Sequence, residues 1–436
     1  MTDDTNARDS LANRHFDFAI VGGGMAGLTM ALMLAPVLER HQKRLVLIEA
    51  FDVKAGDYQP SFDARSTALS EGTRRIFDQM GVWSELAQQV AEIDQIHVSQ
   101  KGGFGTTKMT SRDCQVDSLG YVIENAWLGQ CLMNALSKCN SVEWIAPAKV
   151  TGLTQLPEGV ELALDTGHAL STNFLMVADG AQSSVRGMLG IEASKTAYNQ
   201  HALVCNVGTR LSHQNVAYER FTPEGPLALL PLTNTSAMTG SGKTALDKNS
   251  SNNTSRSALI WSVPEDQIEQ RLAMSDREFS QLLEQQFGTR LGPITKVGSR
   301  ASYPLSLMRV TDQVRPGIVL LGNSAHALHP VAGQGFNLII RDLLCLSEAI
   351  TERLNQHQSL MELNWLSQYQ DQRQLDQWLT TSFSHWLIEL FTNDASWLTR
   401  LRELGLIALD RIAPAKSLFA RQAMGLGLGA QGNYKR

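Results

Sequence analysis

Three glycines have the spacing that lets a backbone loop approach a pyrophosphate: Gly22, Gly24 and Gly27. They follow a short apolar run at 17–21 and precede a segment with helical spacing, so backbone N–H groups at a helix N-terminus would face an anion. Glu49 ends the next apolar run, where a carboxylate can accept both hydroxyl protons of an adenosine ribose. Strand, glycine turn, helix, strand and acid together predict a dinucleotide site.

The glycine spacing alone is not specific. Residues 427–432 repeat the same pattern close to the C-terminus, with no strand before them and no helix after them. Because the context is missing there, we interpret only the first copy as a binding loop.

A second polar segment follows the apolar run 174–178. Asp179 and Gly180 end that run, and Arg186 follows a few small polar residues later. These groups could bind a phosphate or a ribose. Considered alone, the segment fits an ordinary Asp-Gly turn with a solvated arginine better.

A third segment, 321–337, joins an apolar run to a long helical pattern. Gly333, Gln334 and Gly335 directly precede that helix, so free N–H groups and the positive helix end would suit an anionic ring or a phosphate. His326 and His329 raise the question of a zinc site. With no third ligand nearby, a packed or capping pair is favoured, and we expect no metal.

These motifs need buried strands to position them. Short apolar runs at 17–21, 45–48, 174–178 and 318–321 predict strands of one sheet, while the alternating, Pro-flanked segments between 200 and 265 predict an antiparallel sheet. The pattern is helical from 337 onward. We therefore expect an α/β protein: a Rossmann-like domain, an inserted antiparallel-sheet domain and C-terminal helices.

The expected boundaries follow the composition. A polar tail covers 1–15. The dinucleotide-binding domain would comprise 16–90, 120–186 and 300–350. The inserted, substrate-binding domain would comprise 91–119 and 187–299, with a mobile Ser/Asn/Thr-rich loop at 239–257, and the helical region would cover 351–436.

Composition excludes several classes of protein. With 436 residues, 43% apolar residues and a net charge of −5, the chain is neither a disordered protein nor a good candidate for binding nucleic acid. Five widely spaced cysteines, without a CxxC pair, indicate reduced thiols. The polar N-terminus and the absence of a long apolar run lead us to expect a cytoplasmic protein, either free or peripheral on the inner face of the membrane.

The three segments together resemble the class A flavoprotein aromatic hydroxylases, the family of para-hydroxybenzoate hydroxylase. The resemblance runs from about residue 16 to about residue 346. It implies FAD as the cofactor, with the glycine loop and Glu49 at the adenosine, and with Asp179, Gly180 and Arg186 near the pyrophosphate and the nicotinamide route. It places the third segment at the ribityl chain and flavin ring, through residues Asn323, Pro330, Gly333, Gln334, Gly335 and Asn337.

One position departs from the family: Asn323 stands where an aspartate is usual. An amide oxygen can still accept a ribitol hydroxyl, but the charge is lost. Together with segments 65–70, 219–228 and 302–305, this asparagine resembles the ubiquinone-biosynthesis hydroxylases, in particular those acting on 2-polyprenyl-6-methoxyphenol. By the same resemblance Arg65 approaches the FAD pyrophosphate or the flavin edge, although a solvated loop charge fits it equally well.

The resemblance implies ring hydroxylation of a polyprenyl methoxyphenol, with NADPH or NADH as a transient reductant and O2 activated as a flavin C4a-hydroperoxide. A base must deprotonate the phenol. His97, His201, Tyr218 and Tyr303 are candidates by residue type, and the sequence does not choose among them. Two alternatives stay open: a flavin-dependent prenyl reductase or dehydrogenase, and a catalytically idle flavin protein in a lipid-handling assembly.

The C-terminal segment 396–436 has seven basic residues against two acidic ones, beside an apolar stripe at 397–404. It could lie on an anionic membrane surface or join a ubiquinone-biosynthesis complex. Packing of an ordinary helix with a solvated basic side is an equal alternative.

Overall fold

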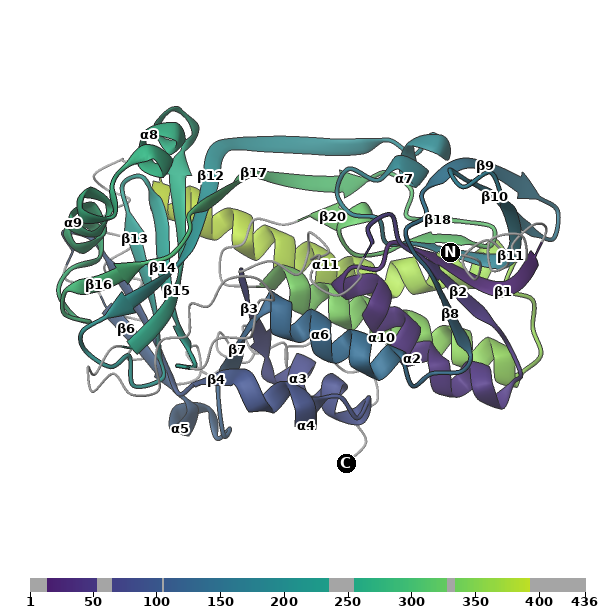
Figure 1. The fold of residues 1–436 in the computed structure, drawn as a ribbon, viewed down its shortest axis with the longest axis horizontal. Coiled ribbons are helices and arrows are strands. Elements are labelled where there is room, and N and C mark those ends of the chain that lie inside the picture. The colour runs from purple at the N-terminus through teal and green to yellow at the C-terminus, as the bar shows by residue number, and fades with distance from the viewer. Residues whose placement is uncertain (1–13, 53–64, 104–105, 235–254, 328–333, 393–436) are drawn as a thin grey trace, which may run out of the picture.

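The computed structural model describes residues 14–52, 65–103, 106–234, 255–327 and 334–392, with side chains to Ser382 in the last helix. The polar tail, the segment 328–333 and the residues after 392 lie outside this part. Figure 1 shows two lobes joined by long strands and by one long helix, α11 (Leu363–Thr392).

The first lobe is built on a mainly parallel sheet. Its parallel strands lie in the order β8-β2-β1-β11-β19. All four residues of β2 are buried, because helices and further strands cover both faces. The strands predicted at 174–178 and 318–321 are confirmed as β11 and β19, and the structure pairs the two as neighbours. The strands are β1 (Arg14–Val21), β2 (Leu45–Ile48), β8 (Val142–Ile145), β9 (Val150–Leu156), β10 (Gly159–Leu164), β11 (Ala169–Val177), β18 (Val314–Arg315) and β19 (Ile318–Leu320).

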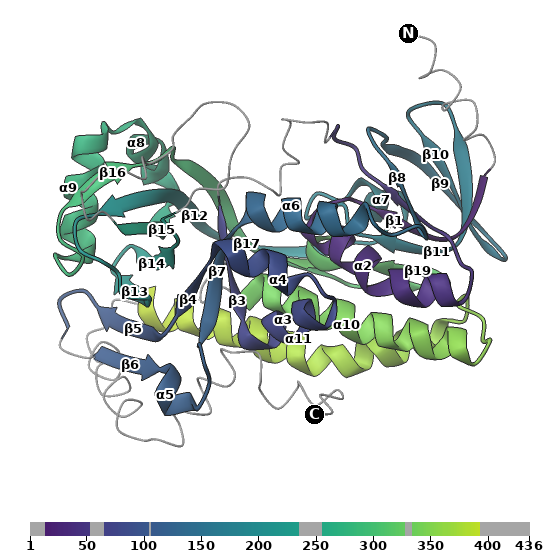
Figure 2. The ribbon, with the colours of Figure 1, turned by 60° about the horizontal axis from the view of Figure 1, so that its bottom comes forward.

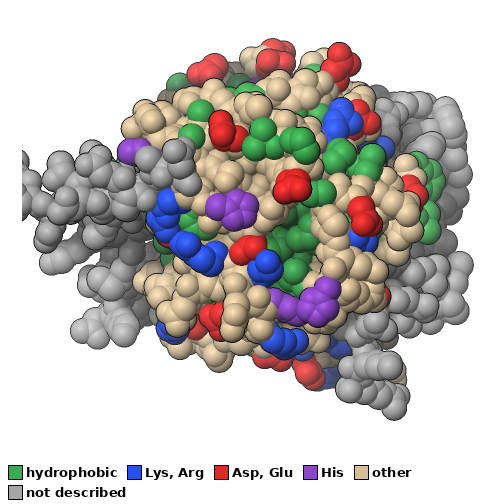
Figure 3. All heavy atoms as spheres, turned by 90° about the vertical axis from the view of Figure 1, so that its right-hand side faces the viewer, with side chains coloured by type: hydrophobic (Ala, Val, Ile, Leu, Met, Phe, Trp, Pro, Cys, Tyr) green, Lys and Arg blue, Asp and Glu red, His purple; other side chains and the backbone are tan. Residues whose placement is uncertain are grey.

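Helices cover one face of this sheet, where Phe18 and Ile20 of β1 contribute to one apolar cluster with Leu28 and Leu343 of the helices. The helices on this side are α2 (Met25–Arg40), α6 (Asn125–Leu136) and α10 (Gln334–Asn355). The antiparallel strands β9 and β10 and the short helix α7 (Ser184–Met188) contribute to the cluster on the other face. At the end of the molecule that carries β9 and β10, acidic and basic side chains are interspersed (Figure 3).

The second lobe is a mostly antiparallel sheet in the order β20-β17-β12-β15-β14-β13-β5-β6. Helices α8 (Ile268–Ala273) and α9 (Asp276–Phe287) cover its outer face, where Trp261 and Phe279 are fully buried. The strands are β5 (Gln95–Gln100), β6 (Thr106–Thr110), β12 (Ala193–Thr209), β13 (Val216–Thr222), β14 (Gly225–Leu232), β15 (Ser255–Pro264), β16 (Ile294–Val297), β17 (Ala301–Val310) and β20 (His326–Ala327).

A small sheet and one long helix connect the lobes. The small sheet has the order β3-β7-β4, from β3 (Ser66–Ser70), β7 (Gly120–Glu124) and β4 (Val90–Ile93). Helix α11 (Leu363–Thr392) lies beside α10 and reaches β13 and β14 of the second sheet (Figure 2). The remaining helical elements are α3 (Glu71–Gln79), α4 (Trp83–Leu86), η1 (Ala87–Gln89), α5 (Ser111–Cys114), η2 (Glu265–Gln267) and η3 (Gly322–Ser324).

The expected α/β fold class with antiparallel sheet and C-terminal helices is confirmed. The prediction of a loop at 239–257 is wrong for its last three residues, because Ser255, Arg256 and Ser257 begin strand β15. All three pair with β12, and Arg256 and Ser257 also pair with β14. The rest of that loop, 239–254, lies outside the described residues. Among the helices in the described part, none is long and apolar enough to span a membrane.

Candidate cofactor-binding site

The glycine loop is a place where three backbone segments meet closely. Gly22 has φ +106°, and a Cβ added there would lie 2.4 Å from the Ala178 carbonyl oxygen at the end of β11. A Cβ added to Gly27 would lie 1.9 Å from the Gly22 carbonyl oxygen. Glycine is therefore required at both positions. Gly22 has a positive φ and lies too close to β11 for a side chain, and a side chain at Gly27 would prevent α2 from packing against the glycine loop.

Glu49 lies where the sequence predicts, directly after β2. Its carboxylate is 3% exposed; Oε2 accepts a hydrogen bond from the Gly23 N–H at 2.5 Å, and Oε1 accepts one from the Phe51 N–H at 2.9 Å. The acid thus fixes the glycine loop against the end of the neighbouring strand, at the edge where parallel α/β sheets bind their ligands.

The start of α2 is suited to an anion. Its N-cap, Gly24, makes no side-chain capping hydrogen bond, and its first turn contains no acidic residue. The first N–H groups of a helix need partners, and the helix dipole adds positive potential there. A phosphate would satisfy both conditions.

Asp179 follows β11 beside the same loop. Its Oδ2 accepts a hydrogen bond from the Val185 N–H at 3.3 Å, whereas its buried Oδ1 has no hydrogen-bond partner within the described residues. Burial raises the pKa of this carboxyl, against hydrogen bonds that lower it. A buried acceptor without a partner fits a hydroxyl group of a ligand.

Arg186 joins the second segment to the third. Its Nη1 donates to the Ser324 carbonyl oxygen and its Nη2 donates to the Ala181 carbonyl oxygen, both at 2.9 Å. Ser324 in turn donates from Oγ to the Val177 carbonyl oxygen at 2.6 Å. The guanidinium therefore holds the η3 turn against the end of β11 and leaves Asn323 exposed on that turn.

The start of α10 brings Gln334, Gly335 and Asn337 to the small sheet. Asn337 is 2% exposed; its Oδ1 accepts hydrogen bonds from the Ser70 N–H at 2.8 Å and the Thr73 hydroxyl at 2.7 Å, and its Nδ2 donates to the Ala68 carbonyl oxygen. Asn337 thus joins α10 to β3 and α3. Pro330 and Gly333 lie outside the described residues, as does His329.

Arg65 lies where the two lobes meet. Its guanidinium stacks 4.3 Å from the centre of the Tyr303 ring in the second sheet, and its carbonyl oxygen accepts a hydrogen bond from the Asn125 N–H. Figure 1 places the elements that carry the three segments at one end of the parallel strands. The contacts to FAD assigned to these residues stay predictions.

Comparison with known proteins agrees with this geometry. Residues 15–384 match the FAD binding domain family. The chain is 32% identical to the ubiquinone hydroxylase UbiL of Rhodospirillum rubrum, over 96% of this chain and 92% of that protein.

This chain belongs to the family of FAD-dependent monooxygenases.

It is also 28% identical to the 3-demethoxyubiquinol 3-hydroxylase of Escherichia coli, over 95% of this chain and 100% of that protein. Its fold matches the solved p-nitrophenol 4-monooxygenase PnpA of Pseudomonas putida, with a TM-score of 0.72 and 18% identity, over 95% of this chain and 99% of that one. The predicted resemblance to class A hydroxylases is confirmed.

The residues of this monooxygenase fit FAD. A close-approach glycine loop, an uncapped helix start and the unpartnered Asp179 Oδ1 gather at the ends of β1 and β11. A dinucleotide supplies groups for each of them: phosphates for the N–H groups and hydroxyls for the carboxylate.

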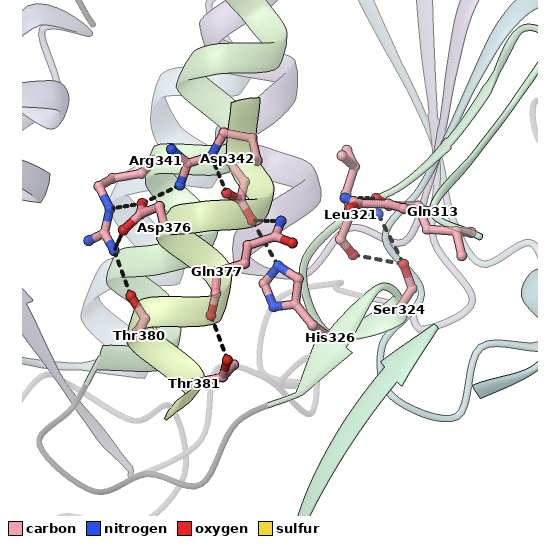
Figure 4. Close-up of polar contacts among 12 residues, drawn as sticks. Gln313, Leu321, Ser324, His326, Arg341, Asp342, Asp376, Gln377, Thr380 and Thr381 are labelled. Atoms are coloured by element: carbon pink, nitrogen blue, oxygen red, sulfur yellow. Dashed lines mark hydrogen bonds and ion pairs between the residues drawn. The ribbon is translucent and has the colours of Figure 1, made fainter. Parts of the chain in front are cut away.

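Sequence reasoning missed a buried charge network behind the third segment (Figure 4). His326 Nε2 lies 2.8 Å from Asp342 Oδ2 of α10, and Arg373 of α11 donates to both Asp342 and Asp376. Asp376 also accepts a hydrogen bond from Arg341 Nε at 2.8 Å. The network therefore ties β20, at the start of the third segment, to both long helices. His326 is packed, as expected, and no group of three metal-ligating residues occurs within the described ranges.

Opposite charges dominate the titration of this network. Burial alone would raise the pKa of Asp342, but Arg373 and His326 outweigh burial and lower it. The pKa of Asp376 is lowered in the same way by Arg341 and Arg373. Both carboxylates are therefore charged partners of the helices at neutral pH.

Most of the proposed proton acceptors lie on the outer, helix-covered face of the second sheet. His97 is 4% exposed, and burial together with the neighbouring Arg290 lowers its pKa to about 4. The Tyr218 ring packs on His97 and on Phe287 of α9. His201 shares a strand face with the buried Leu203. Only Tyr303, of the four candidates, lies on the face that Arg65 contacts.

Proposed function

We propose that this monooxygenase hydroxylates the aromatic ring of a polyprenyl methoxyphenol in ubiquinone biosynthesis, with O2 and with NADPH or NADH as the reductant. The observation that carries the proposal is the similarity to two ubiquinone-pathway hydroxylases over nearly the full length of both chains. The gathered cofactor segments support the same assignment. Activation of O2 requires a cofactor, because amino-acid side chains lack that chemistry.

In this proposal bound FAD would supply the oxygen chemistry, and the chain's own residues would bind and orient FAD and the substrate. Glu49 and the loop at Gly22 hold the adenosine half, the N-terminus of α2 holds a phosphate, and Asp179 Oδ1 accepts a hydroxyl proton. Asn323 and the start of α10 at Gly335 would hold the ribityl chain and the ring. Helix N–H groups there stabilise negative charge on the ring.

The nicotinamide cofactor has no separate domain in this proposal. The described residues contain one parallel sheet with a glycine loop, and that loop is assigned to FAD. NADPH or NADH would therefore bind transiently as the reductant.

The experiment uses the purified holoprotein. We expect NAD(P)H oxidation and O2 uptake to rise together when a polyprenyl methoxyphenol is added. A prenyl reductase would turn over its lipid without O2 uptake, and an idle flavin protein would respond to neither. In a strain without the gene, mass spectrometry should find the unhydroxylated methoxyphenol accumulating; its absence would contradict the proposal.

A polyprenyl phenol partitions into membranes, so the enzyme has to meet a bilayer or a partner that delivers the substrate. We propose that the basic segment 396–436, which lies outside the described residues, provides this contact. Removing the residues after Ser396 should lower co-sedimentation with anionic liposomes. Unchanged co-sedimentation would contradict this role.

A further inference from the structure

One cross-strand row on the inner face of the second sheet carries a single carboxylate. Glu219 of β13 pairs with Val98 of β5 on one side and with Ala228 of β14 on the other. The register continues from Ala228 to Ile260, then to Val204 and Ala301. We call these six residues the Glu219 row. Apart from the glutamate, every side chain in it is aliphatic.

The Glu219 row faces away from the core of its own lobe. The neighbours along the same strands, such as Leu203, Leu229 and Trp261, are fully buried under α9. All six residues of the row, in contrast, keep partial exposure. Alternate residues of a strand point to opposite faces, so the row belongs to the inner face.

Contacts between the lobes enclose the row from two sides. On one side, Ala217 and Ala258 of the next row are buried in a cluster with Ile93 and Val122 of the small sheet. On the other side, Tyr303 lies under the guanidinium of Arg65. The Glu219 row therefore lies between two places where the second sheet meets the FAD-binding lobe.

Glu219 has no hydrogen bond or ion pair among the described residues, and burial alone raises its pKa to about 7. The two rows that flank the Glu219 row on the same face contain no charged residue. One row consists of residues 96, 217, 230, 258 and 206, and the other consists of residues 100, 221, 226, 262, 202 and 303. Helix α11 also contacts β13 and β14, and its buried charges Arg373 and Asp376 are held in the network of Figure 4.

An aliphatic surface with one unpaired carboxylate suits an aromatic ring that bears a hydroxyl group. Binding sites of this kind are mostly apolar with few polar groups that fix orientation. We propose that Glu219 is the catalytic base that takes the proton of the substrate's ring hydroxyl. The proposal rests on the proposed function, because it needs a phenolic substrate.

The step is a simple proton transfer. The phenol O–H bond breaks, the proton moves to a carboxylate oxygen of Glu219, and the electron pair stays on the ring oxygen as a phenolate. A phenol titrates near 10 and an exposed glutamate near 4.3. Burial raises the pKa of Glu219 to about 7, which narrows the gap to the pKa of a phenol and makes the proton transfer more favourable at equilibrium.

The test compares Glu219→Gln with Glu161→Gln, a matched change at an exposed glutamate of β10 in the first lobe. With Glu219→Gln we expect FAD content and flavin reduction by NAD(P)H to persist, while kcat for hydroxylation falls by about 10²- to 10⁴-fold. The acidic limb of the kcat/KM profile near pH 7 should disappear. Glu161→Gln should match the wild type in every measurement.

A series of phenols separates a base from a structural residue. As the pKa of the phenol falls, kcat of Glu219→Gln should approach that of the wild type, because a ring oxygen that is already ionised needs no base. A phenol acidic enough to ionise in water should recover most of the lost rate. A kcat within threefold of wild type with an unchanged pH limb would overturn the inference.

The remaining outcomes are also decisive. If the glutamine variant does not hold FAD, Glu219→Asp carries the test: its shorter side chain should hold the carboxylate farther from the ring hydroxyl, lower kcat and shift the acidic limb, and an unchanged kcat and limb would overturn the inference. If wild-type protein turns over no phenol, the proposed function fails instead. The two failures are therefore distinguishable.

Discussion

The contact between Gly27 and Gly22 predicts the effect of one added methyl group. In Gly27→Ala the Cβ would lie 1.9 Å from the Gly22 carbonyl oxygen, against a closest ordinary approach of 3.0 Å. The obstacle is backbone, so no side-chain rotation relieves it. The Gly22 backbone cannot easily shift away from Gly27, because the Ala178 carbonyl oxygen packs against it. The start of α2 must therefore move away from β1 by about 1 Å.

That displacement acts on the N–H groups assigned to the FAD phosphates. Hydrogen bonds to charged groups contribute about 1.5–3 kcal/mol each, and they weaken steeply as geometry degrades. Losing one of them corresponds to about 10- to 100-fold weaker binding of FAD. We expect Gly27→Ala to fold with a reduced FAD content and to bind added FAD more weakly by that factor.

The assay is a fluorescence titration of apoprotein with FAD. The control is Gly187→Ala in α7, where an added Cβ meets nothing within 4 Å. That variant should bind FAD like the wild type. If Gly27→Ala folds and its Kd for FAD stays within twofold of the wild-type value, the assignment of this loop to the phosphates is wrong.

Three further predictions concern other buried polar groups. Asp342→Asn should lower the free energy of unfolding by about 3–5 kcal/mol in denaturant titrations, because Arg373 and His326 lose a buried partner; Asp312→Asn, in an exposed pair, should change it by less than about 1 kcal/mol. Folding lowers the pKa of Asp342, so this carboxylate should stabilise the wild type fully above its unfolded pKa near 4 and lose that stabilisation as the pH falls further. Asp342→Asn should not show this acid-dependent loss of stability. Asp179→Ala should weaken FAD binding by about tenfold and Asp179→Asn by less, because the amide oxygen still accepts a hydrogen bond; equal affinities for all three proteins in calorimetry would argue against a ligand contact. Arg290→Met should raise the pKa of His97 from about 4 toward its ordinary value without reaching it, since burial is the larger cause, and an unchanged titration in NMR would show that Arg290 does not act on the imidazole.

Local patterns predicted the parts of the site that local rules determine. The glycine loop, its helix and Glu49 follow from a strand, a tight turn and a second strand within about 35 residues, and each element has its own sequence signal. The strands at 174–178 and 318–321 were predictable because central parallel strands are apolar throughout. That the two strands are neighbours in the sheet is a finding of the structure.

Contacts between distant segments left no comparable signal. Arg186 looks like a solvated turn residue in the sequence, yet it donates to the carbonyl of Ser324. Asp342 and Asp376 lie on separate helices that read as ordinary amphipathic segments, so their pairing through Arg373 depends on how α10 and α11 pack. Glu219 sits in an alternating strand, where a glutamate usually points to solvent. The domain boundaries and the individual FAD contacts stay predictions.

The central claim is that this chain inserts an oxygen atom into a phenolic ring. The most direct test is mass spectrometry of the product formed by the purified holoprotein from a polyprenyl methoxyphenol, with NAD(P)H, under isotopically labelled O2. The account predicts one labelled oxygen atom in each product molecule. A product without the label, or lipid turnover that proceeds without O2, would contradict it.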